Sequence, residues 1–403
     1  MVAMTDSKVF DVAHWMRPGT LQLHALPPLS LYVHLPWCLK KCPYCDFNSH
    51  AWSKESGELP SQAYVQALLH DLELSLPLIW GRPIHSIFIG GGTPSLFPPE
   101  AVADLISGIR ARLMLVPACE ITLEANPGTF ERDRFRAMRQ AGVTRLSVGV
   151  QSFNNRHLSA LGRVHDADQA LAAASEAAAC FDQWNLDLMY ALPAQSRDDL
   201  REELKTLAAL KPPHVSIYQL TLEPNTQFAK FPPTQMPDQD TAYDMLDDIL
   251  AFAGQMGLER YEISAFAAPA KRCWHNTNYW QFGDYLGIGA GAHSKISFAH
   301  RIVRHVRLRD PMLYLQQASS MPVAQCNEVK RDELPFEFML NALRLVDGFP
   351  LAWFNERTGL PLSALEPGLQ TALDKQWLSL ENGTLCPTPV GLDFLSEVQQ
   401  LFL

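Results

Sequence analysis

The sequence predicts an α/β fold, in which parallel β/α units form a barrel or part-barrel that a small helical domain follows. Six β-type runs alternate with helical patterns in the first two thirds of the chain, which is typical of parallel βαβ units. No dinucleotide-binding glycine fingerprint follows the first run, which disfavours a doubly wound sheet, the alternative fold. Polar and glycine-rich motifs follow the runs at the ends where (β/α) barrels carry function.

Length and composition indicate a globular protein with a sizeable core, since 47% of the 403 residues are hydrophobic. The net charge of -10, without a long Lys/Arg block, argues against nucleic acid as a partner. No long apolar run and no N-terminal signal core are present, so we expect no membrane span and a cytoplasmic location. In that reducing compartment the eight cysteines are not expected to form disulfides.

The periodicity places the elements in order. Residues 1–28 lack a pattern and are interpreted as an N-terminal arm, and the barrel is expected over 29–265. Strands are predicted at 31–35, 86–89, 119–124, 145–150, 184–189 and 214–218. Helices are predicted at 61–78, 99–113, 129–141, 166–179, 196–210 and 238–256. Capping residues such as Ser196 and terminal glycines such as Gly257 set several of these helix ends.

Residues 266–310 are interpreted as a connecting segment, and residues 311–403 as a small, winged-helix-like C-terminal helical domain. Helices are predicted over 334–345, 350–358 and 361–376. A hairpin of 378–380 and 384–387 is predicted around Asn382-Gly383. The connecting segment ends in a basic run with arginines at 301, 304, 307 and 309, for which a solvated face is the favoured interpretation.

Three cysteines, Cys38, Cys42 and Cys45, lie within eight residues directly after the first strand. Thiolates on so short a loop can converge on one soft metal centre. Three thiolates on a cluster of four irons leave one iron open to another ligand. The alternative is structural zinc, for which His34, Asp46 or His50 would supply the fourth ligand.

Further motifs follow at the ends of the next four strands. They are Gly90-Gly91-Gly92-Thr93-Pro94 after the second strand, Glu124 at the end of the third, Gln151 after the fourth and Asp187 near the end of the fifth. Singly, the glycines read as a turn, Glu124 as a solvated strand end, and Asp187 as an ion-pair partner of Arg163. Together they predict one site at one end of the barrel.

The cysteine loop, the Gly-Gly-Gly-Thr-Pro motif and Glu124-Ala125-Asn126-Pro127 resemble the radical S-adenosylmethionine (SAM) superfamily. More closely, the chain resembles the oxygen-independent coproporphyrinogen III oxidase family from residue 29 to about 385, and within it the heme chaperone HemW branch. The resemblance implies an α/β fold with a partial (β/α)6 TIM-type barrel and the family's C-terminal helical domain.

The resemblance also implies cofactors and roles. Cys38, Cys42 and Cys45 would hold a 4Fe–4S cluster whose fourth iron SAM chelates, so that one electron cleaves SAM to methionine and a 5′-deoxyadenosyl radical. SAM binding is implied for Tyr32, Tyr44, Gly91, Gly92, Thr93 and Glu124. Gln151, Arg163 and Asp187 match positions that contact a second SAM or the substrate region. An electron donor protein is an implied partner, and no catalytic residue is assigned.

Two features favour the chaperone branch. Phe47 stands where the oxidases carry a fourth cysteine, and His275 begins the His-Asn-x-x-Tyr-Trp motif associated with heme-binding members. His275 is therefore the candidate heme ligand; Cys273 and His293 compete with it, and a structural histidine is the alternative interpretation. Some of the basic-run arginines would then pair with heme propionates.

We therefore expect a chaperone that transfers heme to an acceptor hemoprotein. The alternative is an oxygen-independent coproporphyrinogen III oxidase that makes protoporphyrinogen IX. Whether the chain turns over a substrate as an enzyme stays open at this point.

Overall fold

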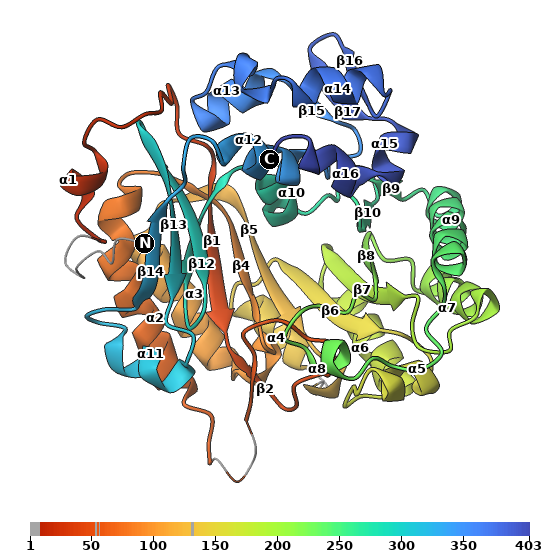
Figure 1. The fold of residues 1–403 in the computed structure, drawn as a ribbon. Helices are drawn as coiled ribbons and strands as arrows, with labels where there is room; N and C mark the ends of the chain where they lie inside the picture. Colours follow the sequence, from red (N-terminus) through yellow and green to blue (C-terminus); the bar gives the residue numbers. More distant parts are fainter. Residues whose placement is uncertain (1–8, 53–54, 56, 130–132) are drawn as a thin grey trace.

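The computed structural model describes residues 9–52, 55, 57–129 and 133–403, and a single large sheet dominates it. Its 12 strands follow the order β14-β13-β12-β11-β1-β4-β5-β6-β7-β8-β10-β9 (Figure 1). The six predicted strands are confirmed as its parallel centre: β1 (Leu29–Leu35), β4 (Ile84–Gly91), β5 (Leu115–Ala125), β6 (Arg145–Gln151), β7 (Trp184–Tyr190) and β8 (His214–Gln219). Among the described residues β14 and β9 each pair on one side, so the sheet is a partial barrel.

The helices that connect these strands pack on the outer face of the sheet and on one another (Figure 1). They are α2 (Ser61–Ser75), α3 (Pro99–Arg112), α4 (Arg134–Gln140), α6 (Ala167–Cys180), α7 (Arg197–Leu210) and α9 (Gln239–Gln255). Asp166, Ser196 and Asp238 cap the last three as the sequence indicates. Part of the predicted start of α4, residues 130–132, lies outside the described residues. The short helices α5 (Asn155–Ala160) and α8 (Gln227–Lys230) were not predicted.

Alternation along the parallel strands separates two chemical environments. One set of alternate residues, such as Leu31 and Val33 on β1, belongs to the main hydrophobic core beneath the helices. The other set is largely polar and its members bond to one another across strands. For example, the Ser147 hydroxyl donates to Asp187, and the Asn185 amide donates to Ser147. The inner face of the barrel is therefore polar, and this is the face that can accept polar ligands.

The sheet continues beyond β1 through residues that the sequence analysis assigned elsewhere. Residues 266–310, expected to be a connecting segment, supply α10 (Trp274–Trp280), β11 (Asp284–Ile288), β12 (His293–Phe298) and β13 (Arg301–Arg307). β11 pairs parallel with β1, and β14 (Val323–Glu328), from the expected helical domain, completes the edge. At the other edge lie β9 (Glu259–Arg260) and β10 (Ala265–Ala267), and α11 (Pro311–Gln317) packs on α2.

The basic run is not a solvated face, and that interpretation was wrong for most of it. Arg307 is fully buried, with its Nε 3.0 Å from Asp71 on α2 and its Nη2 2.8 Å from Ser75. Arg304 pairs with Glu337, and Arg301 is also largely buried. The three arginines recur every third residue along β13, so Arg301 and Arg307 lie on one face of the strand and Arg304 on the other. Each has an acidic partner: Glu328 for Arg301, Glu337 for Arg304 and Asp71 for Arg307.

The C-terminal helices form a second hydrophobic core (blue, top of Figure 1). They are α12 (Leu334–Ala342), α13 (Ala352–Thr358), α14 (Gly368–Asp374), α15 (Pro389–Asp393) and α16 (Leu395–Gln400). The predicted hairpin is present as β16 (Leu378–Glu381) and β17 (Thr384–Pro387), which β15 (Phe349–Pro350) extends to three strands. Phe338 lies at the centre, its ring 5.5 Å from Phe349 and 5.4 Å from Phe354.

The N-terminal segment joins both cores. Its described part contains α1 (Val12–Trp15) and is otherwise irregular, as expected of an arm. Trp15 packs in the main core, whereas Leu21 and Leu23 pack in the C-terminal core. The arm is therefore packed along the molecule and contributes to its stability.

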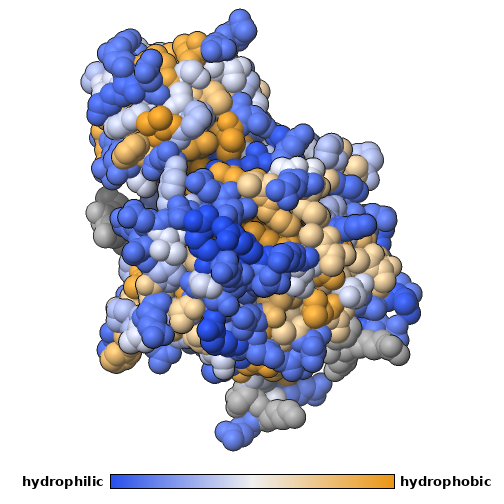
Figure 2. Space-filling view, turned by 90° about the vertical axis from the view of Figure 1, so that its right-hand side faces the viewer, coloured by the Kyte–Doolittle hydropathy of each residue, from blue (hydrophilic) through white to orange (hydrophobic). Residues whose placement is uncertain are grey.

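The face over α7 and α9 shows hydrophilic and hydrophobic residues intermixed (Figure 2). On this face Arg197 pairs with Asp244 and Asp248. Within the described part of the chain, no helix is long and apolar enough to cross a membrane.

We predict that Arg307→Met destabilises the protein by about 3–5 kcal/mol, because the carboxylate of Asp71 then remains buried without its charge partner. Urea unfolding, followed by circular dichroism, measures the change. Arg201→Met, which breaks exposed ion pairs, is the matched control and should cost at most about 1 kcal/mol. The double variant Asp71→Leu/Arg307→Met should recover much of the loss; equal losses in the arginine variants would contradict the role of the buried pair.

Candidate functional site

The cysteine loop and the glycine motif are held against each other at the C-terminal ends of β1 and β4. The Gly92 N–H donates to the Leu35 carbonyl and the Thr93 N–H to the Trp37 carbonyl, both at 2.8 Å. A Cβ on Gly92 would lie 2.6 Å from the Trp37 oxygen, so only glycine permits this approach. The motif is therefore part of the loop's support as well as a strand end.

The loop runs between β2 (Trp37–Cys38) and β3 (His50–Ala51), and its three thiols are half-buried and free of disulfides. Burial raises the pKa of Cys38 and Cys45, and the Thr93 hydroxyl opposes this at Cys38. Thiols with a raised pKa lose their protons readily only when a cation lies beside them. A soft metal centre would be such a cation, so these thiols suit it as ligands. His34, one possible fourth zinc ligand, has its ring nitrogens 2.8 Å from Tyr32 Oη and 3.0 Å from the Asn48 carbonyl. The thiol set therefore fits a cluster with three cysteine ligands better than a closed zinc site.

A column of rings leads from the loop into the barrel. Tyr32 stacks on Phe88 at 5.9 Å and hydrogen-bonds to His34. Burial lowers the pKa of His34 to about 4, so this imidazole is neutral at pH 7. Tyr32 is thus fixed beside the loop, with its ring on the inner face of β1.

Two carboxyl groups lie on the inner face below the glycine motif. The Gly91 N–H donates to Glu124 Oε2 at 3.0 Å, and burial together with Asp187 raises the pKa of Glu124 to about 7. Asp187 accepts from Ser147 at 3.0 Å and Asn185 at 2.7 Å. Glu124 is therefore no solvated strand end, and no ion pair between Asp187 and Arg163 forms among the described residues.

Arg163 instead reaches the cysteine loop. Its Nη1 lies 3.6 Å from Cys42 Sγ and 3.5 Å from Tyr44 Oη, and its Nη2 donates to the Gly149 carbonyl at 2.7 Å. A Cβ on Gly149 would lie 3.0 Å from Gln151 Nε2 and 3.6 Å from Arg163 Nη2, so the Gln151 and Arg163 side chains are close to each other beside Gly149. The structure thus brings the loop, Tyr44, Gln151 and Arg163 together.

A pocket of about 380 Å³ opens beside the loop, between it and the β11–β13 edge. Its lining residues are Tyr32, His34, Asp46, Phe47, Asn48, Tyr279, Tyr285, Gly291, His293 and Arg309. Phe47, His293 and Arg309 are exposed. Although much of the His293 surface is accessible, the pocket wall removes part of the water around its ring; this desolvation, with the charges of Arg304 and Arg309, lowers the pKa of His293, so its imidazole is neutral at pH 7. The sequence analysis missed Asn48 because its hydrogen-bond partner, the Ala290 carbonyl, is 242 residues away in the chain. It missed Tyr285 because this residue lies on β11, a strand that was not predicted.

His275 and Cys273 do not line this pocket. They are buried at the start of α10, next to Glu120 on β5, and the His275 ring lies 4.1 Å from Phe88. Glu120 was missed because it stands in the middle of a strand; its position on the inner face, four residues before Glu124, was the available signal.

The fold and site define a class of protein. Residues 32–207 match the model of the radical SAM superfamily and residues 329–394 that of the HemN C-terminal domain. The solved coproporphyrinogen III oxidase HemN of Escherichia coli has the same fold, with a TM-score of 0.79 at 23% identity over 94% of this chain and 90% of that one. This is a radical SAM protein, a class that implies a 4Fe–4S cluster and SAM.

The family within that class follows from closer relatives. The heme chaperone HemW of Escherichia coli is 44% identical over 94% of this chain and 99% of its own length. The heme chaperone HemW of Haemophilus influenzae is 42% identical over 94% of this chain and 98% of its own length. The chain belongs to the HemW family of heme chaperones.

The end of β6 yields a pH prediction. Gln151 has a left-handed φ of 68°, and the next residue, Ser152, donates to buried Glu203 on α7. Burial raises the pKa of Glu203 to about 8, above its value of about 4.5 in an unfolded chain. Between these two pKa values the folded state holds a proton that the unfolded state has released. The stability that the proton gives is therefore lost progressively as pH rises, and it is gone above about pH 8.

We expect the free energy of unfolding to fall as pH rises from about 5 to about 8 and to level off above that, and Glu203→Gln to remove up to about 1.4 kcal/mol per pH unit of that slope. Urea unfolding at each pH measures this. Glu202→Gln, an exposed neighbour, should leave the slope unchanged. A slope that persists in Glu203→Gln would contradict the assignment.

Proposed function

We propose that this chain is a heme chaperone of the radical SAM type, which binds heme beside its cluster site and transfers it to an acceptor hemoprotein. The observation that carries the proposal is the end-to-end likeness to proteins named heme chaperone HemW. The pocket between the cysteine loop and β11–β13, with exposed histidine, arginine and aromatic side chains, supports it.

The proposed cofactor roles rest on the contacts around the loop. Cys38, Cys42 and Cys45 would hold the 4Fe–4S cluster, and the Arg163 guanidinium next to Cys42 would stabilise its thiolate. Tyr32, Tyr44, Gly91, Gly92, Thr93 and Glu124 would bind SAM, with Glu124 as the hydrogen-bond acceptor. Gln151, Arg163 and Asp187 would face SAM or the substrate side. When bound, the cluster and SAM would supply one-electron chemistry. The chain would orient them against the polar inner face of the barrel and keep water away from them.

The heme site that we propose is the pocket, with His293 as the axial ligand. Its neutral imidazole is exposed, whereas His275 and Cys273 are buried and directed at Glu120. Tyr279 and Tyr285, whose ring centroids are 4.7 Å apart at an interplanar angle of 71°, give the pocket aromatic side chains that a porphyrin could contact. Of the basic-run arginines only Arg309 lines the pocket, so Arg309 would pair with a propionate.

The second candidate function is oxygen-independent coproporphyrinogen III oxidation, which the common fold with HemN favours. The likeness at 23% identity shows the fold alone. Phe47, with 57% of its surface exposed at the mouth of the pocket, stands where the oxidases carry a further cysteine.

One experiment separates the two functions. The cluster is reconstituted anaerobically, and the protein is then assayed for coproporphyrinogen decarboxylation and titrated with heme. We expect saturable heme binding and transfer to an apo-hemoprotein without decarboxylation. Robust decarboxylation without stable heme binding would overturn the proposal.

For the cluster, we predict that Cys42→Ser abolishes the iron–sulfur absorption, because two thiolates and a hydroxyl do not hold a 4Fe–4S cluster. Iron and sulfide analysis after anaerobic reconstitution measures it. Cys386→Ser, on β17 of the C-terminal hairpin, is the control and should keep full absorption. Full iron and sulfide in the Cys42 variant would contradict the ligand assignment.

For heme, we predict that His293→Ala weakens binding at least about tenfold, some 1.4 kcal/mol, and alters the Soret band, since the axial imidazole is lost. His275→Ala is the matched control and should retain both the affinity and the spectrum. The reverse outcome would move heme to the His-Asn-x-x-Tyr-Trp motif.

A further inference from the structure

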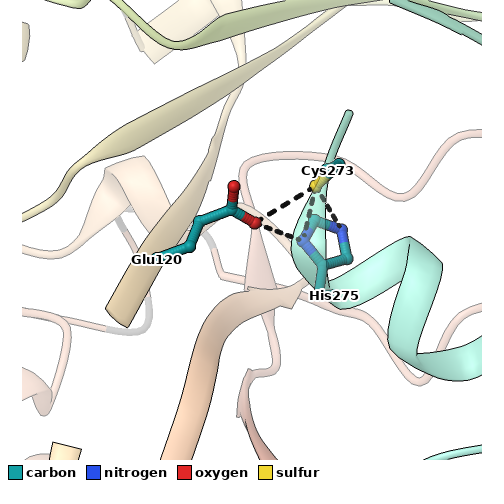
Figure 3. A group of neighbouring side chains, drawn as sticks. All are labelled: Glu120, Cys273 and His275. Atoms are coloured by element: carbon teal, nitrogen blue, oxygen red, sulfur yellow. Dashed lines mark hydrogen bonds and ion pairs between the residues drawn. The ribbon is translucent and has the colours of Figure 1, made fainter. Parts of the chain in front are cut away.

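Three side chains of metal-binding type converge inside the barrel, away from the cysteine loop. Figure 3 shows Glu120 pointing from β5 toward Cys273 and His275 at the start of α10. Glu120 Oε1 lies 3.4 Å from Cys273 Sγ and 3.6 Å from His275 Nδ1. Glu124 lies four residues further along β5, so this group is about 13 Å along the strand from the SAM side of the barrel.

The spacing suits ligands around one ion. With Zn–S of about 2.3 Å and Zn–N or Zn–O of about 2.0 Å, tetrahedral ligand atoms stand about 3.3–3.5 Å apart. The distance of 3.4 Å from Glu120 Oε1 to the sulfur agrees with this, and the distance of 3.6 Å from Oε1 to His275 Nδ1 is slightly longer. Cys273 Sγ lies 2.9 Å from His275 Nδ1 and 3.6 Å from Nε2, so a small rotation of the imidazole brings one nitrogen to the required separation.

We propose that Glu120, Cys273 and His275 bind one divalent transition-metal ion, with zinc as the reference metal. Thiolate and imidazole select zinc-like ions over magnesium and calcium. In the part of the chain that the structure describes, the group contains these three ligands, which leaves a fourth position open as in zinc sites that keep a water. The site is separate from the cluster cysteines and from the heme pocket.

Neighbouring residues hold the group in place. Arg145 Nε donates to Glu120 Oε2 at 2.7 Å, so the other carboxylate oxygen, Oε1, faces the sulfur of Cys273. Arg145 Nη2 also donates to the Lys271 carbonyl at 3.1 Å, and this fixes the segment that leads to Cys273. The Trp274 N–H donates to Oε1 at 3.0 Å. These contacts set the ligand directions before an ion arrives.

Charge and access set the expected affinity. The Arg145 cation opposes a bound ion, so the site should bind zinc less tightly than a four-thiolate site does. Cys273 and His275 are buried, but Trp274 between them is 44% exposed, so the group lies near the surface.

The test uses the full-length chain with Cys38, Cys42 and Cys45 replaced by Ser, so that the loop can capture neither zinc nor iron. After dialysis against buffered Zn²⁺, elemental analysis should find roughly one zinc per chain. Co²⁺ in its place should give a thiolate-to-cobalt charge-transfer band. Cys273→Ser should remove the band and lower the zinc content at least tenfold, as should Glu120→Gln, which keeps the size of the side chain.

Cys119→Ser is the matched control, because this buried thiol adjoins Glu120 but lies outside the group; it should keep both the zinc and the band. Circular dichroism verifies that each variant is folded. Absence of zinc and of the band in the parent chain, or their retention in folded Cys273→Ser and Glu120→Gln, would overturn the proposal. Heme and SAM binding, measured separately, test the proposed function independently.

Discussion

The period-two alternation of the six parallel strands is the constraint on which the structure depends. Because neighbouring strands are in register, the alternation turns one set of residues outward beneath the helices and the other inward. Outward, apolar burial stabilises the sheet. Inward, carboxyls, amides and hydroxyls satisfy one another across strands, and the same face offers acceptors near the cysteine loop and metal-type ligands further down.

The sequence was sufficient for the parallel centre and for the outer helices. Each strand there is a run of β-type residues followed by a cap or glycine that starts or ends a helix, and these signals are local. It was insufficient for β11–β14. Arg304 and Arg307 read as a solvated basic run, because the partners that make them structural, Glu337 and Asp71, are far away in the sequence. A buried ion pair leaves no local pattern.

The same limit divides the site. The cysteine loop, the glycine motif and Glu124 all lie at strand ends, so the register of the barrel was enough to expect them together. The surroundings of His275 depend instead on how α10 packs against β4 and β5. Local sequence placed a histidine beside a tyrosine and a tryptophan, whereas packing directs that histidine to a thiol and a carboxylate.

Asn48, directly after the cysteine loop, hydrogen-bonds to residues that are neighbours in space but distant in the sequence. Its amide donates to the carbonyls of Ala290 and Arg309, and Gly291 has no Cβ to obstruct it. During synthesis on the ribosome, the loop emerges more than 240 residues before these carbonyls do. The nascent chain therefore carries its three thiols on a loop that the glycine motif already supports but that lacks the two Asn48 contacts until Arg309 has left the exit tunnel.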